Sequence, residues 1–508
     1  MKETSPLLKG HLSDATERPI YSSIPIEDPS SSYSDITNAL KSSRSDLTDE
    51  ENRDIKVYVK HCWEILKLVL PVSLGYVIEF MNPFISTYAV ASLGSEALAS
   101  SAISSMFANV TGWSIVFGMT TSLDTLCSQA FTGAEDVKIL GVYLQRGFLV
   151  TISLFLPVSL IWWHAEELLL AIGQEPGLSQ LCGLYLKWSL FAVPGFITFE
   201  CCKKFLQSQG IMNASTQILL LSLPVSVASN FFLVSYPSTS IGFIGAPISS
   251  AITIWFCAFM SIGYILFIDG EKAWGGFSLK AFSEWGPILR LGIPGVLQIC
   301  SEWWAYELLA FGASYISMNA LAGHSAVSNI SSLFYQVALG GGVVASNLVG
   351  NDLGEGLPRR ARLSAVCALI VMLFIGSLCS TVIFTFMPFW STLFNNEPQI
   401  VKIVCSLLPI VALFQIGESI AGLGNGVLRG TGRQDLGATM NILVFYFIGI
   451  PSGFFLAFYC HLGVQGLWSG FSIGISILAV IAVYIILTTD WVDEARKASI
   501  RVGSSEPL

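Results

Sequence analysis

The sequence predicts an all-α membrane protein in which twelve transmembrane helices form two pseudo-symmetric lobes of six helices each. Three observations lead to this fold class: the composition, a series of long apolar segments and an internal repeat. Of the 508 residues, 53% are hydrophobic and only 12% are charged. Soluble domains carry roughly 25% charged residues, so this chain lacks the polar exterior that a water-soluble fold of its length needs.

Twelve apolar segments are separated by polar connections. Each is long enough to span a membrane, because about 20 apolar residues cross ~30 Å of hydrocarbon. We predict spans at 66–90, 98–123, 139–163, 181–203, 214–235, 243–268, 287–313, 320–346, 362–388, 401–426, 437–460 and 463–488.

The polar segments divide the chain. The first 62 residues are rich in Ser, Asp and Glu and lack an apolar stretch, so we expect a disordered tail rather than a signal peptide. The predicted parts are a cytoplasmic tail, an N-terminal six-helix lobe, a cytoplasmic loop, a C-terminal six-helix lobe and a second cytoplasmic tail, at 1–62, 63–268, 269–286, 287–488 and 489–508.

The basic residues predict which way the chain faces. With twelve spans, both termini lie on one side of the membrane. All of the 26 Lys and Arg residues except Lys187 and Lys402 fall in the tails, loops or loop flanks of that side. By the positive-inside rule this side is cytoplasmic. The count includes Lys203, Lys204 and Arg429 as residues that flank loops.

The two halves of the chain repeat one another. Residues 65–71 match residues 288–294 at a shift of 223, and the same shift carries Glu79 onto Glu302. Gly210 matches Gly432 at a shift of 222. Copies with six spans each insert in the same orientation and are related by an axis along the membrane normal. Two such lobes around a central site are typical of transporters that work by alternating access.

Three glutamates fall deep inside predicted spans: Glu79, Glu302 and Glu418. A charged carboxylate at the centre of a bilayer costs several kcal/mol, and protonation relieves that cost. Such a group can therefore load and release a proton, and it can pair with a cationic cargo when deprotonated. Glu307 follows Glu302 on the same helix but is rotated by about 140° from it. For Glu302 the alternative is a structural hydrogen bond or a buried ion pair, although we expect no basic residue at its depth.

Aromatic residues accompany Glu302. Trp303 and Tyr306 are candidates for the wall of a substrate cavity, since aromatic faces beside a carboxylate suit an organic cation. Asp124 is a further cavity candidate; like Glu200, it lies near a predicted span end and could instead be an ordinary interfacial charge. The eleven cysteines and five histidines are scattered without metal-ligand spacing, so no metal site or disulfide framework is predicted.

Four motifs resemble the multidrug and toxic compound extrusion (MATE) family of transporters. They are a proline followed by Glu-Trp-Trp within 294–307, Thr-Leu-Cys-Ser-Gln-Ala-Phe at 125–131, Phe-Leu-Gln-Ser-Gln at 205–209 and Asn-Gly-Val-Leu-Arg-Gly at 425–430. The resemblance runs from about residue 60 to 490. It implies antiport of organic, often cationic compounds against protons, with Na⁺ as the alternative coupling ion.

By motif position the resemblance assigns Glu302, Glu307 and Glu418 to proton and substrate binding. Some animal members carry another glutamate where this chain has Asn329, which makes Asn329 a further cavity candidate. We expect a monomer in the lipid bilayer, with a small organic cation or metabolite as its partner, no cofactor beyond the coupling ion and no nucleic acid.

The destination of the cargo stays open between export across the plasma membrane and sequestration in a vacuole. Glu3, Leu7 and Leu8 resemble an acidic dileucine signal, which would engage a sorting adaptor and favours the vacuolar or lysosomal membrane. Three other functions are alternatives to an antiporter: a flippase for lipid-linked precursors, a membrane-embedded enzyme and a channel. A flippase would need a cationic cavity for phosphate, whereas the deep charges are expected to be acidic. An enzyme would need convergent catalytic residues at membrane depth, and a channel would not exchange protons for cargo.

Overall fold

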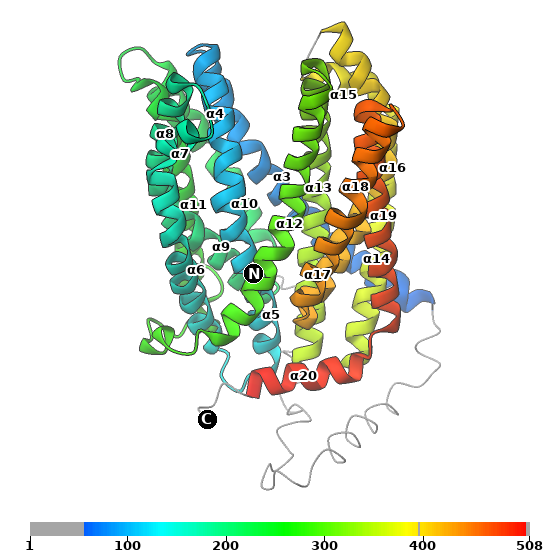
Figure 1. Ribbon diagram of the computed structural model, residues 1–508. Coiled ribbons are helices and arrows are strands. Elements are labelled where there is room, and N and C mark those ends of the chain that lie inside the picture. The colour runs from blue at the N-terminus through cyan, green and yellow to red at the C-terminus, as the bar shows by residue number, and fades with distance from the viewer. Residues whose placement is uncertain (1–54, 395–396, 504–508) are drawn as a thin grey trace.

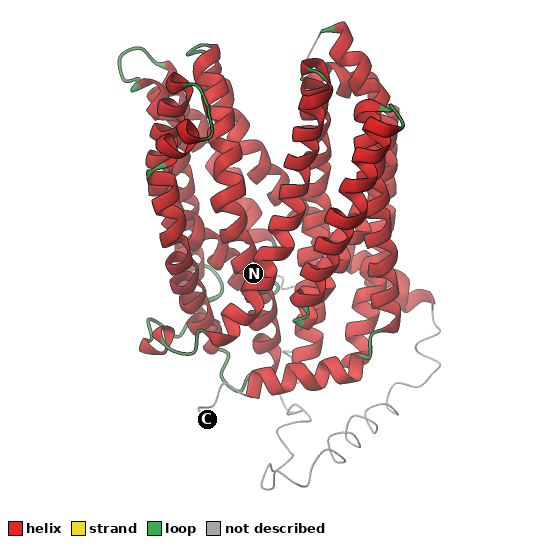
Figure 2. Cartoon of the chain, in the orientation of Figure 1, coloured by secondary structure: helices red, strands yellow, loops and turns green. Residues whose placement is uncertain are grey.

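A computed structural model describes residues 55–394 and 397–503 (Figure 1). The dileucine sequence lies outside these residues. Within the described ranges the chain is helical and contains no strand, and most helices are joined by short connections (Figure 2).

The N-terminal half contains six long helical segments, several of them interrupted. In order they are α3 (Ile55–Ala91), α4 (Ser95–Ala108) continuing into α5 (Ser114–Gly133), α6 (Ile139–Trp163), α8 (Pro176–Ser189) continuing into α9 (Val193–Ser208), α10 (Asn213–Asn230) and α11 (Gly245–Phe267), with the short α7 (Ala165–Ala171) after α6.

The C-terminal half repeats this order. Its segments are α12 (Gly286–Ile316), α13 (Met318–Gly354), α14 (Pro358–Thr385), α16 (Pro398–Thr431), α17 (Gln434–Val444) continuing into α18 (Ile450–Phe454), and α19 (Gly463–Thr488), with the short α15 (Met387–Leu393) after α14 and a final helix α20 (Trp491–Gly503).

Eleven of these segments are long and apolar enough to cross a membrane within the described residues. The twelfth, α12, has 31 residues but is less apolar, because Glu302, Glu307 and other polar residues lie along it. The prediction of twelve transmembrane helices in two similar sets of six is confirmed. The repeat extends to backbone detail, since Gly210 and Gly432 end equivalent segments with φ angles of 76° and 73°.

The two halves form two bundles that meet at one end of the molecule. In Figure 1 the bundles converge toward the bottom, where α20 lies beneath the C-terminal bundle and reaches α5 of the other, and diverge toward the top. We call the bottom the α20 end and the top the far end. Contacts between the halves run from the middle of the molecule, where Trp304 Nε1 donates to the Val110 carbonyl at 3.1 Å, to the α20 end.

Glycines allow the halves to touch through their backbones. A Cβ added at Gly118 of α5 would lie 2.4 Å from the Cα of Val296 on α12, and one at Gly354 of α13 would lie 2.2 Å from the Gln129 carbonyl of α5. Side chains at these positions would separate the helices. Lipid tails are as apolar as the helix side chains, so no hydrophobic effect drives helices together in a membrane. Small residues, which allow close backbone packing, are therefore the usual means of helix association there.

The helix α3, the first that the structure describes, packs on both halves. From its beginning to its middle it lies against the C-terminal half, where His61 Nε2 lies 3.1 Å from Ser364 Oγ and Ser73 Oγ donates to the Val337 carbonyl at 3.2 Å. Its middle contacts α10 of its own half, since Thr216 Oγ1 donates to the Pro71 carbonyl at 2.6 Å. The helix α12 holds the equivalent position, with its first half packed on α5.

Candidate functional site

Two buried carboxylates lie close together in the C-terminal half. Glu302 of α12 and Glu418 of α16 are 6% and 1% exposed, and they are near enough to interact electrostatically. The helices are tied together by Gln298, which lies one turn before Glu302 and donates from Nε2 to Asn425 Oδ1 at 2.8 Å. The structure therefore brings together two of the glutamates that the sequence singled out, from positions 116 residues apart.

Aromatic side chains surround this carboxylate pair. Tyr306 donates its hydroxyl to Glu418 Oε1 at 2.9 Å, and the other oxygen, Oε2, is buried without a hydrogen-bond partner. Tyr335, which was not predicted, lies beside the Glu302 carboxyl. The indole of Trp303 is partly buried, 6.3 Å from the Phe117 ring of the other half. One unpartnered carboxylate oxygen beside aromatic rings can accept a proton or a cationic cargo.

Glu307 and Asn329 are not drawn into the same contacts. Both are partly buried, and neither forms a hydrogen bond or ion pair within the described part of the chain. Their assigned roles in proton or substrate binding stay predictions.

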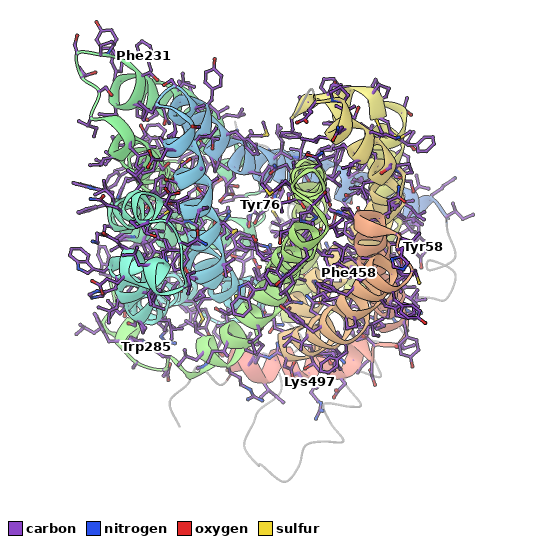
Figure 3. The ribbon with its side chains drawn as sticks, turned by 45° about the horizontal axis from the view of Figure 1, so that its top comes forward. Tyr58, Tyr76, Phe231, Trp285, Phe458 and Lys497 are labelled. Atoms are coloured by element: carbon purple, nitrogen blue, oxygen red, sulfur yellow. The ribbon has the colours of Figure 1, made fainter. Side chains whose placement is uncertain are left out.

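A second cluster of buried charges lies in the N-terminal half. Lys203 of α9 is 2% exposed, and its Nζ lies 2.9 Å from Glu79 Oε2 and 2.5 Å from Glu200 Oε1. The Glu79 side chain is 22% exposed, whereas Glu200 is completely buried. Tyr76, which stacks on the Lys203 ammonium, lies in the middle of the molecule between the two bundles (Figure 3). Thus Glu79, which was predicted to bind protons or substrate, is held by a lysine.

Asp124 links the two halves. Its carboxylate is completely buried on α5, 3.0 Å from Lys204 Nζ of the same half and 3.8 Å from Arg429 Nε of the other half. The alternative of an ordinary interfacial charge is therefore wrong for Asp124, and equally for Glu200. Since Arg429 also acts electrostatically on Glu302, the charges of the two halves form one continuous series.

The expectation that no basic residue reaches the depth of Glu302, and that the deep charges are acidic, is wrong. Lys203, Lys204 and Arg429 are all buried. The predicted spans ended at residues 203 and 426, where hydropathy falls, but α9 continues to Ser208 and α16 to Thr431. The sequence does contain a signal for a buried basic residue. Glu200 and Lys203 are three residues apart, the spacing at which helical neighbours form ion pairs.

Polar contacts close the molecule at the α20 end. Thr125 Oγ1 donates to the Arg429 carbonyl at 2.5 Å and Gln129 Nε2 to the Gly430 carbonyl at 2.9 Å, so α5 is bonded directly to the end of α16. Arg501 of α20 adds a bridge, from Nη1 to Gln129 Oε1 at 2.7 Å and from Nη2 to the Thr431 carbonyl at 2.9 Å.

Comparisons with known proteins agree with a chain built from two similar halves. The sequence profile of the MatE family matches twice, over residues 71–232 and 294–455, which begin 223 residues apart like the internal repeat. Multidrug and toxin extrusion protein 1 of Danio rerio is 34% identical over 87% of this chain and 74% of its own length. Protein DETOXIFICATION 16 of Arabidopsis thaliana is 31% identical over 90% of this chain and 94% of its own.

Among solved structures, the crystal structure of the eukaryotic MATE transporter AtDTX14 is similar, with a TM-score of 0.82 and 30% sequence identity. It covers 88% of this chain and 99% of that one. The likeness therefore extends across both bundles.

Proposed function

This chain belongs to the MatE family of multidrug and toxin extrusion transporters, and from that premise we propose that it exchanges protons for small organic, often cationic, compounds. The observation that carries the proposal is the pair of buried carboxylates, Glu302 and Glu418, beside aromatic side chains. Intramembrane carboxylates are costly when charged and are retained where they take part in transport.

One site serves both exchange partners in turn. When the carboxylate pair is deprotonated, it attracts an organic cation, which Trp303 and Tyr306 hold through their ring faces. Protonation removes the negative charge and with it most of the attraction, so the cargo leaves. Proton and cargo exclude one another, which is the condition for antiport.

We assign the structure to the state in which this pair is reached from the far end. The bundles diverge toward that end, whereas at the α20 end Thr125 and Gln129 are bonded to α16 (Figure 1). Alternating access would then require these bonds, and the Asp124–Arg429 ion pair, to separate. We assign the α20 end to the cytosol, which the basic residues of the loops support through the positive-inside rule.

The far end then faces an acidic compartment, which drives protons onto the carboxylates and cargo off them. We favour the vacuolar or lysosomal lumen as that compartment, with the medium outside the cell as the alternative. A flippase is less favoured, although the buried charges include basic as well as acidic residues. Lys203 and Lys204 are already paired with carboxylates, so their charges are neutralised and do not attract a phosphate.

The test is uptake into proteoliposomes. A panel of organic cations, including tetraethylammonium, is offered with an acidic interior, with an imposed Na⁺ gradient and with no gradient. We expect the proton gradient alone to drive accumulation, and we expect Glu302→Gln and Glu418→Gln to insert normally but to lose it. Glu166→Gln, in the far-end helix α7, is the matched control and should transport normally. Full exchange by Glu302→Gln would contradict the proposal.

A further inference from the structure

The N-terminal half contains a cation site of its own, and its occupant is a side chain. The ammonium group of Lys203 lies between the carboxylates of Glu79 and Glu200, at 2.9 and 2.5 Å. Three ring faces complete the enclosure, with centroids 4.6 Å from Nζ for Tyr76, 5.2 Å for Phe199 and 5.7 Å for Phe117. We call these five residues, two carboxylates and three rings, the ammonium cage.

The composition of the cage is that of a receptor for an organic ammonium ion. Carboxylates supply charge, and rings within about 6 Å of a cation attract it through their faces. The cage residues come from α3, α5 and α9, so the site depends on tertiary packing rather than on one helix. Tyr76, Phe117, Phe199 and Glu200 are buried, and only Glu79, at 22%, has appreciable exposure. The cage therefore opens on the side of Glu79.

The two carboxylates of the cage favour a cation inside it. Two carboxylates face one ammonium there, while the neighbouring Lys204 is engaged by Asp124 at 3.0 Å. Removing one partner of a buried ion pair leaves an uncompensated charge, which costs several kcal/mol. With Lys203 absent, the cage would be a buried enclosure of two carboxyl groups and three aromatic rings, for which a proton and an ammonium ion would compete.

The internal repeat relates the ammonium cage to the carboxylate pair of the C-terminal half. The shift of 223 relates Glu79 of the cage to Glu302 of the carboxylate pair, so the two sites share one pseudo-symmetric carboxylate, on the equivalent helices α3 and α12. At the shift of 222 that relates Gly210 to Gly432, the residue equivalent to Lys203 is Asn425, which is neutral. One site of the pair thus contains its own ammonium, and the other has a neutral amide at the equivalent position.

We propose that Lys203 is a tethered cation that permanently fills the N-terminal member of two pseudo-symmetric cation sites, and that removing it creates a binding site for a small primary ammonium ion. The corollary, that cargo exchange is confined to the C-terminal member, rests on the proposed function; the occupancy of the cage does not.

The first experiment measures binding of labelled methylammonium to purified protein in detergent. We expect Lys203→Ala to bind about one ion per chain more than the wild type, and we expect Lys203→Ala/Glu79→Gln to lose most of that binding. Lys187→Ala, which removes a lysine near the far end, is the matched control and should bind no more than the wild type. Equal binding by wild type and Lys203→Ala would overturn the proposal.

The second experiment uses thermal unfolding and does not depend on transport. Lys203→Ala should melt several degrees below the wild type, and methylammonium chloride should restore the midpoint saturably, whereas NaCl of equal ionic strength should not. Glu79→Gln retains Lys203 and covers the case in which Lys203→Ala fails to fold: methylammonium should leave its midpoint unchanged. Stabilisation of Glu79→Gln by methylammonium, or restoration of Lys203→Ala by NaCl alone, would show that Lys203 does not fill a specific ammonium site.

Failure of the proposed function has a different signature. If the wild type shows no proton-driven uptake but Lys203→Ala gains a methylammonium site, the tethered cation stands and the exchange mechanism falls. If the wild type shows proton-driven uptake but Lys203→Ala gains no methylammonium site, the exchange mechanism stands and the tethered cation falls.

Discussion

Asp124 of α5 and Arg429 of α16 face one another across the boundary between the two halves, with 3.8 Å between Arg429 Nε and Asp124 Oδ2. Both side chains are buried, and Arg429 Nε has no hydrogen-bond partner. Asp124 also forms an ion pair with Lys204, so one carboxylate balances cations from both halves. Arg429 acts electrostatically on Glu302 as well, so the residue that pairs with Asp124 across the boundary also interacts with the carboxylate pair.

Asp124→Asn should destabilise the protein strongly. The substitution leaves Lys204 and Arg429 buried without their shared counter-charge, and breaking a buried ion pair costs about 3–5 kcal/mol. Thermal unfolding in detergent measures the loss. The double variant Asp124→Asn/Arg429→Gln should recover part of it, because one of the two stranded charges is gone. An additive double variant would show that the two residues do not interact.

Tyr306→Phe should slow exchange while leaving the fold intact. The hydroxyl of Tyr306 is the donor to Glu418 Oε1, and leaving a buried acceptor without its donor costs about 1–3 kcal/mol. We expect the exchange rate in proteoliposomes to fall by about tenfold or more. Tyr315→Phe, on the same helix but exposed, is the matched control. Equal rates for the two variants would remove Tyr306 from the site.

Gly118→Leu should shift the molecule away from the state described here. Even the first atom of the new side chain would lie 2.4 Å from Val296 Cα, which forces α5 and α12 apart near the boundary. Spin labels placed on α4 and α13 at the far end should therefore report shorter distances than in the wild type. Gly263→Ala is the control, since nothing lies within 4 Å of its added Cβ. An unchanged distance distribution in Gly118→Leu would contradict this expectation.

Arg501→Ala should loosen α20. It removes the bonds to Gln129 of one half and to the Thr431 carbonyl of the other. Amide hydrogen exchange over 491–503 should rise by about tenfold, in line with loss of roughly 1.5 kcal/mol or more of local stability. Lys497→Ala is a suitable comparison, because Lys497 pairs with Asp493 and Glu494 of α20 itself. Similar exchange in both variants would mean that Arg501 does not anchor the helix.

The sequence predicted the helices well and singled out both glutamates that the structure brings together, because apolar spans and deep charges leave a linear signal. Apolar length marked the spans, the shift of 223 revealed two copies, and depth within a span singled out Glu302 and Glu418. The contacts between helices leave no such signal. Nothing in hydropathy predicts that Gly118 meets Val296, since that contact depends on how two distant helices cross.

The buried basic residues were missed for a related reason. Hydropathy treats Lys203 and Arg429 as the ends of spans, because it considers each side chain alone. In the folded chain their charges are balanced by carboxylates from other helices, and Arg429 is balanced from the opposite half. A charge that is neutralised by tertiary contacts costs far less to bury than a single-residue scale assigns to it. Pairing the deep acids with bases nearby in the sequence predicts these buried charges better than hydropathy does.

The packing of α3 on both halves has a consequence for how the molecule moves. A helix bonded to both bundles must flex when the bundles rotate. Pro71 lies where the two sets of bonds meet, since its carbonyl accepts from Thr216 of the N-terminal half and Ser73 donates to the Val337 carbonyl of the C-terminal half. Proline removes a helical hydrogen bond, so bending there is less costly than elsewhere in the helix. The shift of 223 places Pro294 at the same point of α12. Each copy of the repeat thus contributes one proline at which its first helix can bend.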